Sequence, residues 1–254
     1  MKSRKQDMTF KFDRVLALKI FLVLLASLAV TMQAQISSPE LVFKYDWCGQ
    51  LIDVVGSLFF KNKFGFKKIE STQKEQFRKS LPRLIASWTE QGPILFGEIF
   101  SLFNCGFKQK RRTVTIFLGA NLGYGSSNFL VLGLRSYLDS ELWEEPISRE
   151  DAFAALVFHE LLHIWVDDAI NGESALLTKY GNEHIHVREH IHLMAIQKMV
   201  YLKLQPDMLK FLDESYRKFA SSEYRRAWEI VNDIEGYEKV LQDITDKLTC
   251  SNKS

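Results

Sequence analysis

The pentapeptide His159-Glu160-Leu161-Leu162-His163 constrains this chain more than any other stretch. Residues four apart lie on the same face of an α-helix, so His159 and His163 would point the same way, spaced to bind one metal ion through two imidazoles. Glu160 lies one step around the helix, where its carboxylate could reach a metal-bound water and act as a general base. The alternative is a buried helix whose histidines only hydrogen-bond to their neighbours.

The residues around this motif predict a helix over 149–169, about 20 residues long. Ser148 stands just before it and Asp151 follows three positions later, a variant of the capping box. Asn171-Gly172 supplies a stop signal after the last turn. Apolar residues surround the two histidines, so we expect this helix to be largely buried.

A third metal ligand is expected on the next helix, because a catalytic zinc site uses three protein ligands. Four of the six histidines lie within 184–192, and the pattern predicts a helix from about 182 or 187 to 204. On it, Glu189 shares a face with Leu193 and Ile196, so Glu189 is the predicted third ligand. The alternatives left open are His192, His190 and Glu183.

The HExxH motif resembles the zincin superfamily of zinc metallopeptidases. A glutamate on a following helix is similar to the branch with a glutamate ligand. The resemblance implies Zn²⁺ bound by His159, His163 and Glu189, with His192 as the alternative third ligand. It also implies hydrolysis of peptide or protein substrates, with Glu160 as the catalytic base. The longer HExxHxxGxxH form is absent, because valine and alanine occupy positions 166 and 169.

A small sheet is predicted just before the HExxH helix. Residues 113–118 are β-branched and predict a strand, residues 119–127 are rich in glycine and serine, and 129–132 predict the returning strand of a hairpin. Zincins resemble this arrangement, with a sheet edge beside the active-site helix that holds extended substrate by strand addition. The fold class expected is therefore α+β, predominantly helical and zincin-like, with a second metal-ligand helix after the first.

The flanking segments are predicted to be helical. Ser38-Pro39 has the form of a helix start. A helix from Ser71 or Thr72 is expected to kink or end at Pro82, and Gly92-Pro93 is expected to separate it from another helix over 94–103. Residues 207–254 predict several helices that serve as a packing scaffold.

Composition and the N-terminus bear on partners and location. With 46% hydrophobic residues and a net charge of +2, the chain is an ordinary globular sequence with no indication of a nucleic-acid partner. Residues 1–34 carry a basic leader and a short apolar run, which predicts a secretory signal peptide, or alternatively an uncleaved N-terminal anchor. Residues 35–254 then form one exported domain, periplasmic or secreted, with no membrane insertion unless 1–34 is retained. The oligomeric state is not indicated.

Four further expectations follow from the sequence. Among the three cysteines, Cys48 and Cys105 are the favoured disulfide pair, and Cys250 is left unpaired. Asp167 is the favoured hydrogen-bond partner of a ligand imidazole, ahead of Asp168 and Glu173. The candidates for a donor to the oxyanion are Tyr180, His186, His190 and His192. A non-catalytic zinc-binding or interaction protein of the cell envelope is the alternative function.

Overall fold

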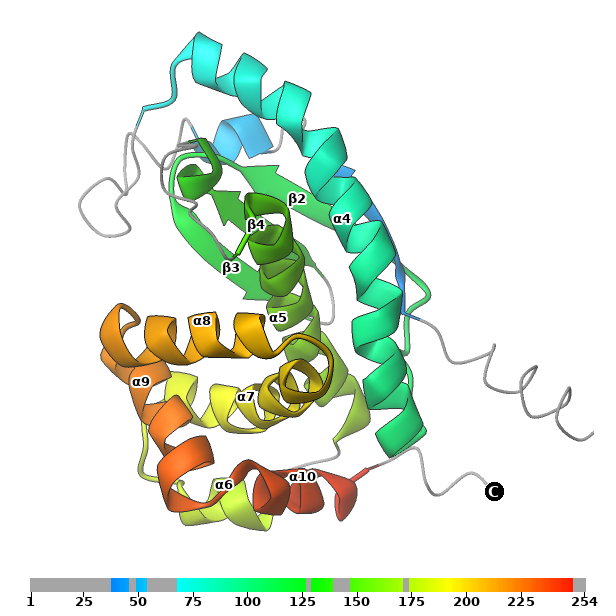
Figure 1. Cartoon of the computed structure of the whole chain (residues 1–254), viewed down its shortest axis with the longest axis vertical. Helices are drawn as coiled ribbons and strands as arrows, with labels where there is room; N and C mark the ends of the chain where they lie inside the picture. Colours follow the sequence, from blue (N-terminus) through cyan, green and yellow to red (C-terminus); the bar gives the residue numbers. More distant parts are fainter. Residues whose placement is uncertain are drawn as a thin grey trace, which may run out of the picture. The chain divides into compact units, whose positions relative to one another are not determined.

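Helices make up most of the described fold, together with one small sheet, as the α+β class predicts (Figure 1). The computed structural model describes residues 38–45, 49–53, 68–126, 129–138, 147–170 and 174–248, all within the unit Ser37–Ser254. In chain order the elements are β1 (Glu40–Lys44), α4 (Ser71–Phe103), β2 (Arg111–Phe117), β3 (Asn121–Gly125), β4 (Leu130–Leu134), η1 (Arg135–Leu138), α5 (Arg149–Ala169), α6 (Ala175–Lys179), α7 (Ile185–Leu204), α8 (Pro206–Lys218), α9 (Ser222–Glu229), the π-helix η3 (Ile230–Ile234) and α10 (Tyr237–Thr245).

The sheet has the strand order β1-β2-β4-β3, which places β3 at an edge. The predicted hairpin between 113–118 and 129–132 is wrong, because β2 and β4 pair in parallel, with Val114 opposite Leu130. The glycine-rich stretch between them contains the strand β3, and β3 makes the antiparallel pair with β4. The turn-forming residues of this stretch therefore led to the prediction of a turn where the structure has a short strand with glycines at alternate positions.

The predicted helix start at Ser38-Pro39 is also wrong, since residues 40–44 form β1 and helix appears only at 49–53 in the described part of this region. Strand β1 pairs in parallel with β2. Leu41 and Phe43, two residues apart, both pack against the main hydrophobic core, as alternate residues on one face of a strand do. Pairing with β2 thus decides the conformation of a segment whose own pattern was ambiguous.

Helix α4 is one continuous helix of 33 residues, with Pro82 and Pro93 inside it, so the predicted boundaries are wrong. An internal proline costs a helix about 3 kcal/mol. Burial along the whole length compensates, because eight residues of α4 from Phe77 to Phe103 are buried. Gly92 contributes to this packing, since a Cβ there would lie 2.7 Å from a carbon of the Trp88 ring.

The predicted bounds of the motif helix are confirmed. Helix α5 spans Arg149–Ala169, and Ser148 caps it by accepting a hydrogen bond from the Asp151 N–H at 3.0 Å. It packs against α4, the strand β3 and the helix α7. Helix α7, predicted to end near 204, ends there. The fold thus brings the HExxH helix between the sheet and the histidine-rich helix.

Several sequence predictions fall on residues that lie outside the described ones. They concern residues 1–34, the stop at Asn171-Gly172, and both Cys48 and Cys250. Cys105 is buried and disulfide-bonded, and its partner lies outside the described residues too. Within the described part, none of the helices is long and apolar enough to cross a membrane.

Candidate metal centre

Three imidazoles meet between α5 and α7. His159 and His163 come from α5 and His190 from α7, and one nitrogen of each lies within 4.8 Å of the corresponding nitrogens of the other two. The ring centroid of His190 lies 5.4 Å from that of His159 and 4.7 Å from that of His163. The three residues are therefore close enough to bind one metal ion.

Hydrogen bonds on the far side of two rings direct their other nitrogens to the shared space. His190 Nδ1 donates to the carbonyl oxygen of His186 at 2.6 Å, and His159 Nδ1 lies 3.4 Å from Oε1 of Gln197. The Nε2 atoms of both rings are buried and have no hydrogen-bond partner among the residues that the structure describes. A buried polar atom without a partner is costly. Two of them facing a third imidazole fit a site that a cation completes.

The electrostatics of the cluster keep its imidazoles neutral. Burial lowers the pKa of His159 well below its usual value, and the neighbouring His163 and His190 lower it further. Burial and the adjacent His190 bring the pKa of His163 to about 3. The pKa of His190 is also lowered, mainly by burial. A neutral imidazole is the form that binds metal, so all three rings are in the ligand state at neutral pH.

Glu160 lies beside the three histidines and is buried, with only 3% of the residue exposed. Its Oε2 atom is also buried and makes no hydrogen bond to any described residue. Burial raises the pKa of this carboxyl to about 8, although a backbone hydrogen bond from Gly125 acts in the opposite direction. A positive charge close by would favour the ionised form. The carboxyl is thus placed as a proton acceptor that depends on a neighbouring cation.

The glycines of β3 create the room that Glu160 occupies. A Cβ on Gly123 would lie 1.8 Å from Oε1 of Glu160, and a Cβ on Gly125 would lie 2.2 Å from the Glu160 carbonyl oxygen. Neither distance is compatible with a side chain, so the edge strand contacts α5 through glycine backbone. Because β3 lies at a sheet edge, this contact leaves a strand edge next to the histidines.

Two cavities open on either side of Glu160, and both are lined by Gly123, Glu160 and Tyr224. The first, which we call the apolar cavity, has a volume of about 350 Å³. Its other lining residues are Asn121, Gly133, Ser136, Tyr137, Ala152, Ala155, Leu156, His159, Gln197, Phe211, Leu212 and Tyr216. The second, which we call the polar cavity, is lined further by Tyr124, Gly125, Ser126, His163, Val166, Asp167, Leu177, Ile185, His186, Arg188, Glu189, His190 and His192.

Tyr224 on α9 stands between the two cavities. Its ring centroid is 4.1 Å from that of His190 and 5.9 Å from that of His159, and the latter pair is nearly parallel. Burial raises its pKa, and the charges of Glu160 and Glu189 raise it further, so the phenol keeps its proton. A neutral tyrosine from a later helix therefore lies against two of the three imidazoles.

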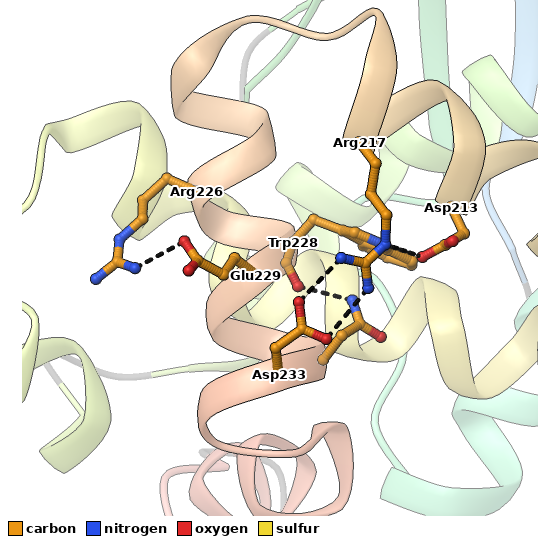
Figure 2. A network of polar contacts seen from close by, with 7 residues as sticks. Asp213, Arg217, Arg226, Trp228, Glu229 and Asp233 are labelled. Atoms are coloured by element: carbon orange, nitrogen blue, oxygen red, sulfur yellow. Dashed lines mark hydrogen bonds and ion pairs between the residues drawn. The ribbon is translucent and has the colours of Figure 1, made fainter.

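A polar network fixes α9 relative to its neighbours (Figure 2). Arg217 of α8 pairs with Asp213 at 2.9 Å and reaches Asp233 of η3 at 3.0 Å. The indole of Trp228 donates to the same Asp213 oxygen at 2.8 Å. A single exposed ion pair contributes about 0–1 kcal/mol, but linked pairs restrain one another. The network thereby sets the position of the helix that carries Tyr224.

The predicted third ligands do not join the cluster. The Glu189 side chain is 49% exposed and pairs with His186 instead. His192 is buried on another side of α7, where its Nε2 lies 2.8 Å from Asp243. Glu183 pairs with Arg226 at 2.9 Å. The alternative His190 takes the place assigned to Glu189, because successive residues of a helix are turned by about 100° and it is the His190 ring that meets His159 and His163, while Glu189 lies at the polar cavity.

Three other residues that the sequence singled out make contacts that differ from the predicted ones. Asp167 is exposed beside the polar cavity, and within the described residues no hydrogen bond joins it to His163. Asp168 is committed to Arg112, 3.6 Å away. Tyr180, a candidate oxyanion donor, instead donates to Glu235 at 2.6 Å.

Three residues of the site were missed in the sequence, namely Gln197, Tyr216 and Tyr224. Gln197 lies seven positions after His190, a spacing that places both on one face of α7, so its role could have been found. Nothing near Tyr216 or Tyr224 in the sequence marks them, because they come from α8 and α9 and approach the histidines only in the folded chain.

No protein-family model matches the chain, and no curated protein or solved structure matches it. The interpretation of the site therefore depends on its own geometry. Three neutral imidazoles with one open side are a ligand set that suits Zn²⁺, among other divalent transition-metal ions.

Proposed function

We propose that this chain is an exported zinc-dependent peptidase, with His159, His163 and His190 as metal ligands and Glu160 as general base. The observation that carries the proposal is the group of three imidazoles beside a buried, unpartnered Glu160 oxygen. The edge strand β3 and the two cavities supply a place for an extended peptide. The disulfide at Cys105 agrees with an oxidising compartment outside the cytoplasm.

The residues around the site can divide the chemistry among them. When bound, a zinc ion would polarise the scissile carbonyl and lower the pKa of a water. Glu160 takes the proton of the attacking water and passes it to the leaving nitrogen. The backbone edge of β3 aligns the substrate by strand addition, for which the glycines leave access. Burial around Glu160 excludes bulk water from these proton transfers.

Tyr224 is the candidate donor to the carbonyl oxygen of the substrate. It lines both cavities beside the ligand imidazoles, whereas Tyr216 is committed to Gln197 by a hydrogen bond of 3.0 Å. Losing one oxyanion donor lowers kcat by about 10²–10³-fold. Tyr224→Phe should show such a loss and keep its zinc. Full activity in this variant would exclude the role.

Metal content tests the ligand set. Wild-type protein refolded with zinc should hold about one ion per chain, and His190→Ala should hold almost none. Glu189→Ala is the matched control, because it changes the adjacent residue without touching the cluster. Elemental analysis after gel filtration measures all three proteins. Zinc loss in Glu189→Ala with retention in His190→Ala would overturn the ligand set.

Glu160→Gln separates a peptidase from a non-catalytic zinc-binding protein. The variant preserves the shape of the side chain and removes its basicity, so we expect zinc to be retained while hydrolysis of a proteome-derived peptide library falls below detection. Mass spectrometry of the library reports the cleavage. Zinc-loaded wild type that leaves the library intact would favour the non-catalytic alternative.

A further inference from the structure

We propose that the apolar cavity receives a large apolar side chain of the substrate, of the size of leucine or phenylalanine, from a residue next to the cleaved bond. The cleavage part of this statement rests on the proposed function. The binding part rests on the cavity alone. Together they define the substrates as peptides that carry a bulky apolar residue at the cleavage site.

The lining of the cavity has the chemistry that such a side chain requires. Tyr137, Leu156, Phe211 and Leu212 contribute apolar surface, and among the described lining residues there is no lysine, arginine or aspartate, although Glu160 forms part of the wall. The volume of about 350 Å³ exceeds the ~150 Å³ of an apolar cavity that holds benzene. A phenyl ring therefore fits, and an acidic side chain would lose its hydration and meet the Glu160 carboxyl instead of a cationic partner.

Two alanines of α5 keep the cavity open. Ala152 and Ala155 line it one to two turns before His159 and are only 7% and 6% exposed. Their neighbours in the helix, such as Phe153 and Phe158, are large and pack into the core on other sides of α5. A larger residue at either alanine would occupy the volume, so small side chains at these positions determine its size.

The position of the cavity links it to the reacting bond. His159 and Glu160 form part of its wall, and Glu160 and Tyr224 also line the polar cavity. A peptide bond placed at Glu160 would therefore direct the side chain of a flanking residue into the apolar cavity. The opposite side presents Asp167, Arg188 and Glu189, which suit polar substrate residues.

The test uses two variants that fill the cavity and one matched control. Ala155→Leu and Ala152→Leu add three carbons inside it. Ala86→Leu makes the same change at an exposed position of α4, away from the site. Thermal melting and zinc content establish which proteins are folded and loaded, and either cavity variant suffices if the other fails to fold.

The first measurement is binding of N-acetyl-phenylalaninamide and N-acetyl-alaninamide, followed by NMR on metal-free and zinc-loaded protein. Because its phenyl group is buried, the phenylalanine amide should bind the wild type and Ala86→Leu about 30-fold more tightly than the alanine amide. In the filled variants, this ratio of the two affinities should fall below about fivefold. Equal binding of the two amides to the wild type, or an unchanged ratio in the filled variants, would overturn the proposal.

The second measurement is the set of cleavage sites in a proteome-derived peptide library. Wild type and Ala86→Leu should cut beside leucine, phenylalanine or similar residues, and the filled variants should shift toward small residues. Cleavage without this preference would overturn the inference and leave the peptidase proposal standing. Phenyl-selective binding that the filled variants lose, in a protein without hydrolysis or zinc, would instead support the cavity and reject the peptidase.

Discussion

The side-chain oxygen of Gln197 lies 3.4 Å from Nδ1 of His159, and both residues are buried. The hydroxyl of Tyr216 donates to the same oxygen at 3.0 Å and lies 3.3 Å from the same ring nitrogen. An acceptor at this place keeps the proton of the imidazole on Nδ1, which leaves the lone pair on Nε2 for a metal ion. Gln197 is thus a positioning residue for His159, one of the proposed metal ligands.

Removal of this acceptor should weaken metal binding. Loss of such an outer hydrogen bond typically costs 10–100-fold in metal affinity, so we expect a loss of about that size in Gln197→Leu. Gln197→Glu keeps an acceptor oxygen and should bind zinc at least as well as the wild type. Gln205→Leu, at the end of α7, is the control. Competition with a chromogenic chelator measures all four affinities, and an unaltered affinity in Gln197→Leu would refute the role.

Gly123 should be required for activity rather than for metal binding. The methyl group of Gly123→Ala would collide with Oε1 of Glu160, 1.8 Å away, and displace the carboxyl. A misplacement of about 1 Å can cost 10²-fold in rate. We therefore expect hydrolysis to fall by about that factor or more, with zinc content unchanged.

Gly97→Ala is the matched control for this substitution. Apart from its chain neighbours and the backbone of its own helix, no atom of the described residues lies within 4 Å of a Cβ at this position in α4, and alanine is the better helix former by about 1 kcal/mol. The control should melt at a slightly higher temperature and keep its activity. Hydrolysis by Gly123→Ala at the wild-type rate would show that the Glu160 carboxyl can move without loss.

Local signals in the sequence were sufficient for part of the site. The cap at Ser148 and the four-residue spacing of His159 and His163 depend only on the helix itself, and both were predicted correctly. The third member of the cluster was less determined, because two adjacent residues, Glu189 and His190, both belong to a predicted helix. The rotation of α7 against α5 decides between them, and this rotation depends on packing across the whole molecule.

The wrong predictions for the segment of β3 and for the bounds of α4 have a related physical origin. The sequence around Gly123 and Gly125 has turn propensity, but pairing with β4 and close contact with α5 make it a strand. At Pro82 and Pro93 the local preference is for a break, and burial of one face of α4 outweighs it. In both places tertiary contacts override local preference, and no pattern within the segment itself reports such contacts.

The disulfide at Cys105 should involve Cys250. The carbonyl oxygen of Cys105 accepts a hydrogen bond from the Trp165 indole at 2.9 Å, which places Cys105 near the C-terminal end of α5. An isolated bridge between Ile170 and Leu248 brings the last described residue to that same end. Cys250 follows two positions later, within the reach of an extended chain.

Cys48 is a poorer partner for geometric reasons. It follows Tyr45, whose ring contacts Phe77 near the start of α4. Cys105 lies two residues after Phe103, the last residue of α4. Phe77 and Phe103 are 26 residues apart on this helix, or about 39 Å at 1.5 Å per residue. A disulfide needs Cα atoms within about 7 Å. Peptide mapping without reduction should therefore give a linked Cys105–Cys250 peptide, and Cys250→Ala should lose about 2–4 kcal/mol of stability. A linked Cys48–Cys105 peptide would contradict this assignment.

Glu235 should make the free energy of unfolding depend on pH in the acidic range. Its side chain is 2% exposed, and hydrogen bonds from Lys179, Lys239 and Tyr180 lower its pKa from 4.5 to about 2 against the opposing effect of burial. Because the folded pKa is depressed, the stabilisation is fully present above pH 4.5 and is lost as the pH falls from there through about 2.

The variant Glu235→Gln should therefore unfold more easily at pH 7, by about 1–3 kcal/mol, and the difference from the wild type should narrow below pH 4.5. Urea denaturation of the metal-free proteins between pH 7 and pH 3 measures this without interference from metal loss. Glu238→Gln, an exposed position three residues later, is the control and should track the wild type. A difference that stays constant across this range would mean that the Glu235 charge does not stabilise the contact between α6 and η3.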